Sequence, residues 1–288
     1  MAYLLKTMYD GYFYILNEKS DPRANDYFLL QSPIPTAIVL FLWYKFVFKW
    51  GPALMEKRPP YNLKRIMIIY NIIQILANSF IVLNCLRAIH FISWTCNPID
   101  YSESYWGRQF LQYCYIYYLL KMADLIDTVF FVLRKKQTHI SFLHTYHHFG
   151  MVMTGWYGAK FVGGGHSYFL GFANCIVHTI LYSYYLLTAL DSKYGKILWL
   201  KKFITQAQLF QFVFLFYMYV QLLWVDCDYP KGILFLFVPQ NLFMIVLFSD
   251  FYVRTYILAP RKKRKLQEEA ERMKDEREKE EIKQAEMK

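Results

Sequence analysis

Long apolar segments are the feature that most limits how this chain can fold. Segments long enough to cross a hydrocarbon core of ~30 Å lie at 33–50, 65–90, 110–133, 139–159, 168–190, 203–225 and 232–257. Hydrophobic residues make up 56% of the chain and aromatic residues 20%, which is typical of membrane helices with interfacial aromatic belts. The sequence therefore predicts an all-α membrane protein with seven transmembrane helices. Polar residues interrupt the third to sixth segments, which indicates helices that line a cavity.

Basic residues are distributed unequally between the two sides of these segments. The loops after the first, third and fifth segments, with the start of the tail, carry 17 Lys and Arg residues, against 6 on the opposite side. The positive-inside rule then puts the C-terminus in the cytosol and the N-terminus on the other side. We expect a non-cytosolic segment at 1–32, a transmembrane domain at 33–257 and a charged cytosolic tail at 258–288. The tail has no apolar stripe, so we expect a solvated helix or disorder rather than a partner-binding coiled coil.

Two of the five cysteines fall in loops on the non-cytosolic side. Cys96 lies between the second and third segments, and Cys227 lies between the sixth and seventh. If this side faces the lumen of the endoplasmic reticulum, the compartment is oxidising, and we expect a disulfide between Cys96 and Cys227. Two unpaired loop thiols are the alternative.

Polar side chains recur at helical spacing inside four of the predicted spans. The HxxHH sequence puts His144, His147 and His148 on one helix face. The other three spans carry polar stripes at Lys121, Asp124 and Asp127, at Asn174, His178 and Tyr182, and at Thr205, Gln208 and Gln211. Burying these groups is costly unless they have partners or a task. We therefore expect the four stripes to face one another.

Four imidazoles on two helices admit several interpretations. Interhelical hydrogen bonds are the structural alternative, although a packed bundle does not need four imidazoles. A di-metal oxygenase needs several histidine boxes, whereas this chain has one box and seven histidines in total. A single catalytic zinc needs only three histidines and is not excluded by counting. Acyl transfer is the fourth interpretation, because burial favours the neutral, nucleophilic imidazole and a dry pocket protects an acyl-imidazole from hydrolysis.

Several ordered motifs carry a resemblance to a known family. They are "SPIPT" (32–36), "GPALMEKRP" (51–59), "DTVFFVLRKK" (127–136), the HxxHH box (144–148), "NCIVHTILYSYY" (174–185) and "TQAQLFQF" (205–212). From Asp21 to about Tyr256 the chain resembles the ELO family of very-long-chain fatty acid elongases, the membrane condensing enzymes of the endoplasmic reticulum. It departs from the family at Asp124, where Glu is usual, and at Leu181, where Met is usual. The shorter aspartate predicts a looser pairing with Lys121.

The resemblance implies a multi-pass protein of the endoplasmic reticulum membrane whose seven helices enclose an acyl-chain tunnel. It also implies that a long-chain acyl-CoA condenses with malonyl-CoA to give a 3-oxoacyl-CoA, CO2 and CoA, without a cofactor or a metal. His147 is then the expected nucleophile, which takes the acyl group. His178 and Asn174 are the expected donors to the enolate or the oxyanion. His144 and His148 are expected to orient the nucleophile or to contact the thioester.

The resemblance assigns further residues to supporting roles. Asp124 and Asp127 are expected to fix a histidine tautomer, and Tyr182 is expected to support them. The residues implied for the CoA portion are Lys121, Arg134, Lys136, His139, Tyr184, Lys201, Thr205 and Gln208.

Acyl-CoA, malonyl-CoA and membrane lipid are the expected partners, together with the ketoreductase, dehydratase and enoyl reductase of the elongation cycle. We expect no nucleic-acid partner. The sequence leaves open a homo-oligomer, the chain-length and saturation preference, the retention signal and whether the covalent step is obligatory. The rival is a seven-span lipid or solute transporter or receptor, which would leave its ligand unchanged and would not consume malonyl-CoA.

Overall fold

The computed structural model describes residues 1–286, and within this range its regular structure is helical, without strands. The longer helices are α1 (Ala2–Glu18), α2 (Ile34–Lys45), α4 (Lys64–Ala88), α5 (Tyr105–Leu133), α6 (Phe142–Phe161), α7 (Tyr168–Leu190), α8 (Leu198–Val220), α9 (Leu234–Tyr252) and α10 (Ala259–Glu286). A π-helical turn (Phe46–Trp50) joins α2 to the short α3 (Gly51–Met55), and a second one (Val253–Leu258) joins α9 to α10. Short 3-10 helices occupy Pro22–Asp26, Ile89–Phe91, Gln137–His139, Gly165–Ser167, Tyr194–Lys196, Gln221–Leu223 and Lys231–Ile233.

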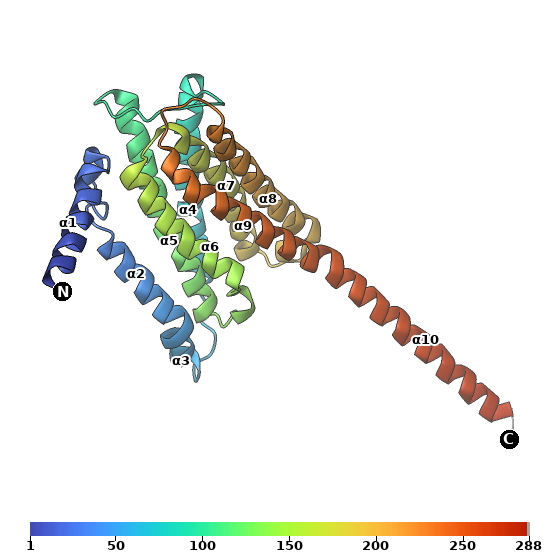
Figure 1. Ribbon diagram of the computed structural model, residues 1–288. Helices are drawn as coiled ribbons and strands as arrows, with labels where there is room; N and C mark the ends of the chain where they lie inside the picture. The colour runs from blue at the N-terminus through green and yellow to red at the C-terminus, as the bar shows by residue number, and fades with distance from the viewer. Residues whose placement is uncertain (287–288) are drawn as a thin grey trace.

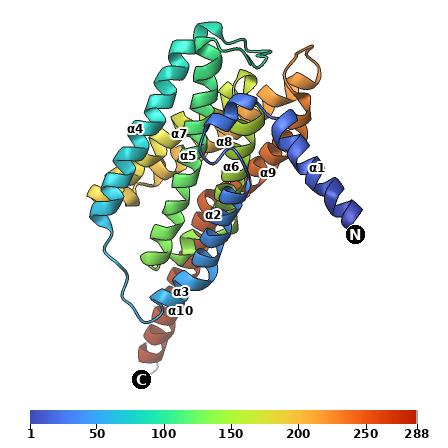
Figure 2. The same cartoon turned by 90° about the vertical axis from the view of Figure 1, so that its left-hand side faces the viewer.

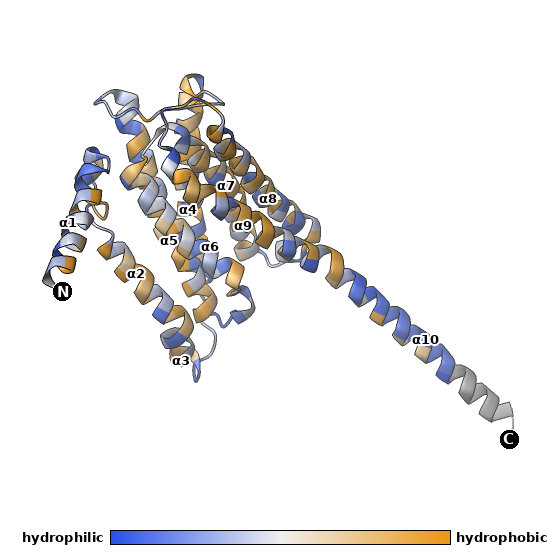
Figure 3. Ribbon diagram, viewed as in Figure 1, coloured by the Kyte–Doolittle hydropathy of each residue, from blue (hydrophilic) through white to orange (hydrophobic). Residues whose placement is uncertain are grey.

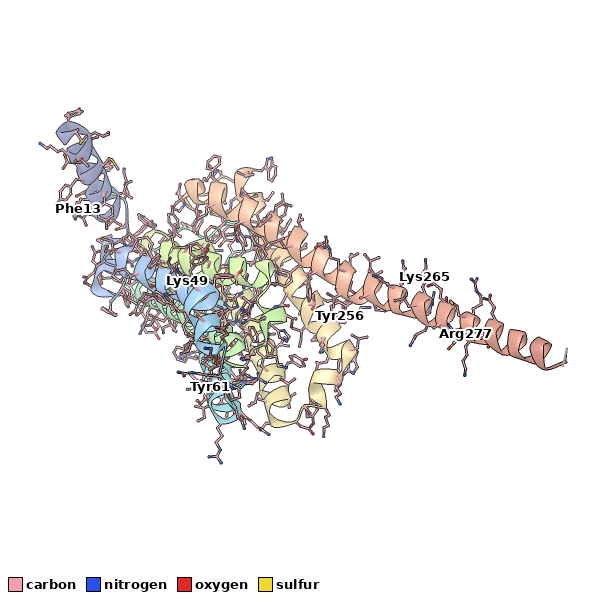
Figure 4. All side chains as sticks on the ribbon, turned by 90° about the horizontal axis from the view of Figure 1, so that it is seen from below. Phe13, Lys49, Tyr61, Tyr256, Lys265 and Arg277 are labelled. Atoms are coloured by element: carbon pink, nitrogen blue, oxygen red, sulfur yellow. A yellow bond between two sulfur atoms is a disulfide. The ribbon has the colours of Figure 1, made fainter. Side chains whose placement is uncertain are left out.

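The helices α4 to α9 pack into one bundle, with α2 and α3 along its side (Figure 1). The most extensive contacts join α4 to α7, α8 to α9 and α5 to α6. The N-terminal helix α1 extends away from the bundle, as the turned view in Figure 2 also shows. The tail helix α10 leaves the bundle at the end of α9, and the side chains of Lys265 and Arg277 project from it far from the other helices (Figure 4).

Among the described residues, five helical segments are long and apolar enough to cross a membrane, namely Ile34–Met55, Lys64–Phe91, Gly165–Leu190, Leu198–Leu223 and Lys231–Arg277. The last of these segments runs from α9 into α10, and Figure 3 shows that its α9 part is apolar whereas α10 is hydrophilic. The helices α5 and α6 are long enough, at 29 and 20 residues, but too polar by the same measure. The predicted all-helical membrane protein is therefore confirmed, and five of the seven predicted spans are found by length and apolarity. The other two are the helices that carry Lys121 and the histidine box.

Two serine caps determine where the polar helices α5 and α6 begin. The Ser104 hydroxyl accepts a hydrogen bond from the backbone N–H of Gly107 at 3.0 Å, and the Ser141 hydroxyl accepts one from that of His144 at 3.2 Å. Such caps satisfy N–H groups that lack a partner in the first helical turn. The helix α5 therefore begins at Tyr105 rather than at residue 110. The cap of α6 fixes the turn that carries the first histidine of the box.

The two ends of the bundle differ. At one end a disulfide joins Cys96 of the α4–α5 loop to Cys227 of the α8–α9 loop, and we call this the disulfide end. The turn between α6 and α7 also lies there, and Gly165 adopts a φ of 55° in it. A Cβ at Gly165 would lie 2.7 Å from the carbonyl oxygen of Asn97, so only glycine fits. We call the opposite end, from which α10 departs, the tail end.

Candidate active site

A buried ion pair within α5 forms the first part of the site. The ammonium Nζ of Lys121 lies 2.8 Å from Oδ2 of Asp124, and the two side chains are only 1% and 3% exposed. The i,i+3 spacing predicts this pair. The expected looser pairing is wrong, because the aspartate reaches its partner directly. Each charge depends on the other, since an unpaired charge in this position would be costly.

Three further groups surround the ammonium of Lys121. It donates to Oδ1 of Asn174 at 2.9 Å and lies 3.3 Å from Nδ1 of His178, both on α7. The ammonium of Lys121 also lies over the ring of Tyr117, with 5.1 Å between Nζ and the ring centroid, which is a cation–π distance. Lys121 is thus beside two of the predicted donors. It is about 20 Å along α5 from Arg134, so it does not join the other residues implied for CoA.

The second oxygen of Asp124 has partners on two other helices. Its Oδ1 accepts hydrogen bonds from Nε2 of Gln74 on α4 at 3.0 Å and from the hydroxyl of Tyr182 on α7 at 2.9 Å. The hydroxyl of Tyr182 also lies 2.8 Å from Oδ2 of Asp127. Of the two aspartates, Asp124 approaches an imidazole, with 3.6 Å between its Oδ2 and Nδ1 of His178. Asp127 contacts a phenol instead.

Gln74 is a residue of the site that the sequence analysis missed. It belongs to a polar stripe on α4 with Asn71 and Asn78, and all three side chains are at most 2% exposed. Their i, i+3, i+7 spacing is visible in "NIIQILAN" (71–78), so the same helical periodicity that marks the other stripes was available here. Because α4 packs along α7, this stripe turns toward the ion pair.

The first histidine of the box is held between two helices. Nε2 of His144 lies 2.8 Å from the hydroxyl oxygen of Thr128 on α5. The rings of His144 and His148 are in contact, with centroids 4.2 Å apart. Thr128 is fully buried and is a second residue that the sequence analysis missed, although it directly follows Asp127 in the "DTVFFVLRKK" motif.

The middle histidine, His147, is enclosed by rings from other helices. The centroids of Phe212 on α8 and Phe248 on α9 lie 6.1 Å and 6.4 Å from that of His147, and the His148 ring lies 5.6 Å away. His147 and His178 are close enough to interact electrostatically. The four predicted imidazoles therefore gather at one place. Within residues 1–286, no three His, Cys, Asp or Glu side chains are arranged to hold a metal ion.

A cationic cavity of about 640 Å³ opens at the tail end between α4, α5 and α7. Lys64, Arg134 and Lys136 are among its lining residues. Burial and then the charges of Lys136, Arg134 and Lys201 lower the pKa of His139, which lies in the loop beside them. Four of the eight residues implied for CoA thus come together here. Such a cluster of cations suits the phosphate groups of a nucleotide.

The remaining implied CoA contacts lie around the start of α8. The hydroxyl oxygens of Thr205 and Tyr256 are 3.2 Å apart, and Tyr184 is close enough to Tyr256 for an electrostatic interaction. Figure 4 shows Tyr256 near the tail end, where the chain passes from α9 into α10. Gln208 follows Thr205 by one turn and is half-buried. Tyr256 was not anticipated, because the sequence analysis placed it at the end of a span.

Two apolar cavities extend toward the disulfide end. The smaller one, about 40 Å³, is lined by Tyr117, which also contacts Lys121, and by Tyr168. The larger one, about 240 Å³, is lined by Tyr168 as well and by aromatic side chains such as Trp94 and Phe169. The candidate site therefore has a cationic cavity toward one end of the bundle and apolar space toward the other.

Comparison with known proteins matches residues 28–265 to the GNS1/SUR4 family, ELO. The chain belongs to this family. It is 38% identical over 257 residues to very long chain fatty acid elongase 7 of Drosophila melanogaster, a match that covers 88% of this chain and 78% of the relative. It is 38% identical over 244 residues to elongase 7 of Rattus norvegicus, covering 82% and 86%, and 36% identical over 239 residues to elongase 4 of Homo sapiens, covering 82% and 76%. The ELO match includes every residue of the candidate site and leaves out α1 and most of α10.

Proposed function

We propose that this ELO family chain is a 3-oxoacyl-CoA synthase of fatty acid elongation, which condenses a long-chain acyl-CoA with malonyl-CoA. The relatives named very long chain fatty acid elongases support the process. The observation that carries the chemistry is the meeting of His147 with the Lys121–Asn174–His178 cluster. It lies between a cationic cavity that suits CoA phosphates and apolar cavities that suit an alkyl chain. Burying each methylene of that chain contributes about 0.8 kcal/mol.

The first half-reaction transfers the acyl group to the enzyme. The neutral imidazole of His147 attacks the thioester carbonyl, the C–S bond breaks, and the departing sulfur takes the imidazole proton and leaves as CoA. His144 and His148 orient the nucleophile. The aromatic walls of Phe212 and Phe248 exclude water and so protect the acyl-imidazole from hydrolysis.

The second half-reaction forms the carbon–carbon bond. Malonyl-CoA loses CO2, the resulting enolate attacks the acyl carbon on His147, and the C–N bond breaks so that the imidazole leaves and takes up one proton. Lys121 and His178 stabilise the negative oxygen as it develops. Because Asn174 accepts from Lys121 through its Oδ1, its amide Nδ2 remains available to donate to the same oxygen. This scheme uses the two substrates and no cofactor.

The membrane arrangement follows from the same proposal. The helices α5 and α6 complete a seven-span bundle, because the apolar helices around them shield their polar faces from lipid. The cationic cavity at the tail end then faces the cytosol and the disulfide end faces the lumen of the endoplasmic reticulum, in agreement with the positive-inside rule. The product would pass to a ketoreductase, a dehydratase and an enoyl reductase.

The test is to incubate the purified protein with labelled long-chain acyl-CoA in the absence of malonyl-CoA. Mass spectrometry should find an acyl adduct on the peptide that contains His147, with an equal amount of CoA released. His147→Ala should abolish the adduct, whereas His90→Ala, an exposed histidine at the disulfide end, should not. Full condensation without an adduct would replace the covalent step by direct attack of the enolate on the thioester. No turnover with both substrates would favour the transporter.

A further inference from the structure

The hydroxyl of Tyr182 lies between two carboxylates but carries one hydrogen. Its oxygen is 2.9 Å from Oδ1 of Asp124 and 2.8 Å from Oδ2 of Asp127. Two oxygens at this distance need a hydrogen between them, and the phenol can supply only one of the two. The second contact therefore requires a hydrogen on a carboxylate. Tyr70 also lies within hydrogen-bond reach of Asp127, but its hydrogen does not lie between the Tyr182 oxygen and a carboxylate, because its hydroxyl donates to the backbone oxygen of Ala123 at 3.1 Å.

The partners of each carboxylate decide which one holds this proton. Asp124 receives three donors, namely Lys121, Gln74 and Tyr182, as an ionised carboxylate does. Asp127 is faced by the phenols of α4 and α7 and shares its helix with Asp124 and Lys121; the titratable groups around it are Tyr70, Tyr182, Tyr185, Asp124 and Lys121. The single cation in this set is already paired with Asp124. Two ionised carboxylates on either side of one buried hydroxyl would repel each other.

We propose that Asp127 is a neutral carboxylic acid that donates a hydrogen bond to Tyr182 and stores the proton that the condensation consumes. The role of Asp127 as a proton store rests on the proposed function, whereas its neutral state does not. Acyl transfer to His147 conserves protons, because the imidazole proton leaves with CoA. The condensation does not, because decarboxylation yields an enolate and the imidazole departs from the acyl carbon without a proton. One proton per product must therefore reach His147.

A chain of contacts connects Asp127 to His178, which is close enough to His147 to interact with it electrostatically. It runs through Tyr182 to Oδ1 of Asp124, from its Oδ2 to Lys121 at 2.8 Å, and from Lys121 to His178 at 3.3 Å. As each link passes one proton onward and receives another, the departing imidazole of His147 gains a proton by way of His178 and Asp127 becomes ionised. It regains its proton from water between turnovers.

The cavity at the tail end offers the path for this recharging. Met67 and Thr188 line it, and they lie one helical turn from Tyr70 and Tyr185, two of the phenols that face Asp127. Water in the cavity therefore comes within about one turn, or 5 Å, of the phenols around the acid.

The first experiment detects the proton without turnover. Infrared spectra of the purified full-length protein should contain the carbonyl stretching band of a buried neutral carboxylic acid, shifted in D2O. Asp127→Asn should remove this band, whereas Asp228→Asn, at an exposed loop aspartate, should keep it. A wild-type spectrum without the band, or a band that survives in Asp127→Asn, would overturn the proposal.

The second experiment separates the two half-reactions. In Asp127→Asn the amide still donates a hydrogen bond to Tyr182 but cannot release a proton. Release of CoA from acyl-CoA alone should stay within about threefold of wild type, while condensation should slow by about 10²–10⁴-fold, the usual contribution of general acid catalysis. Asp127→Glu should recover part of the rate. Equal slowing of both half-reactions would indicate a structural role and contradict the proposal. A wild-type protein that forms no product would instead remove the proposed function and leave the infrared result standing.

Discussion

Thr128 on α5 and His144 on α6 are joined by a hydrogen bond of 2.8 Å between Oγ1 and Nε2. The bond links the helix that carries the buried ion pair to the helix that carries the histidine box. It also fixes the His144 ring against that of His148, since the two centroids lie 4.2 Å apart. The orientation of the histidine box is thus determined by a neighbouring helix.

Replacing Thr128 tests this link. Thr128→Val keeps the shape of the side chain but leaves Nε2 of His144 without its partner, at a cost of about 1–3 kcal/mol. We expect kcat for condensation to fall about 10-fold with little change in KM, and Thr128→Ser to restore most of it. The matched control is Thr7→Val on the exposed α1. A wild-type kcat in Thr128→Val would show that the bond does not hold the imidazole in its active orientation.

The Lys121–Asp124 pair predicts a stability effect that is not additive. Lys121→Met leaves Asp124 as an unpaired buried charge and should destabilise the fold by about 3–5 kcal/mol. The double variant Lys121→Met, Asp124→Asn removes both charges and should recover part of this loss. Thermal unfolding in detergent, followed by intrinsic fluorescence, measures both effects. If the double variant unfolds at a lower temperature than Lys121→Met, the two charges do not compensate each other.

His139 predicts part of the pH dependence of stability. Burial, followed by the charges of Lys136 and Arg134, lowers its pKa in the folded state, so the folded chain binds this proton less readily than the unfolded chain. Its contribution therefore destabilises the fold as the pH falls below ~6.5, the ordinary value for histidine. We expect His139→Gln to reduce the drop in Tm between about pH 7.5 and 5.5 and to leave Tm at the higher pH nearly unchanged. His90→Gln is the control, and a His139→Gln drop as large as that of wild type would refute the assignment.

Filling the larger apolar cavity should shorten the accepted acyl chain. Ala173 lines this cavity of about 240 Å³, and Ala173→Phe would occupy space where the end of an alkyl chain would lie. Loss of two buried methylenes, at about 0.8 kcal/mol each, should lower kcat/KM for the longest substrate by about 10-fold and leave shorter ones unaffected. Ile73→Phe, on the exposed face of α4, is the control. Uniform loss across all chain lengths would indicate a folding defect instead. Product analysis over a series of acyl-CoA lengths distinguishes the two results.

Those features of the fold that depend on the sequence of a single helix, namely its apolar length and its polar face, were predictable. Apolar length predicted seven spans, of which five are found by length and apolarity within residues 1–286, and the i,i+3 and i,i+4 spacings of the polar residues revealed which faces turn inward. Boundaries were less accurate, because a cap such as Ser104 extends α5 into a segment whose composition reads as a loop. The packing of α4 along α7 could not be anticipated, since many helix pairings satisfy the same apolar pattern.

The candidate site likewise contains contacts that the sequence of one helix predicts and contacts that depend on how the helices pack. The contact of Lys121 with Asp124 is local to one helix and follows from spacing. The contacts of Gln74 and Thr128 depend on which helices are neighbours, so the spacing within one helix does not predict their partners. Lys121 also shows the limit of transferring roles by resemblance, because it lies beside Asn174 and away from Arg134 and its neighbours.

The arrangement around Lys121 has a consequence for how a substrate enters. An ammonium has three hydrogens, and Asp124, Asn174 and His178 already occupy its surroundings at 2.8 Å, 2.9 Å and 3.3 Å. If the proposed function holds, a thioester oxygen that binds Lys121 must therefore displace one of these neighbours. Ground-state affinity gains little from such an exchange, while a developing oxyanion, which attracts the ammonium more strongly, gains much more. Under the proposed function, the three neighbours of Lys121 thus compete with the thioester oxygen of the bound substrate but are displaced by the oxyanion of the transition state.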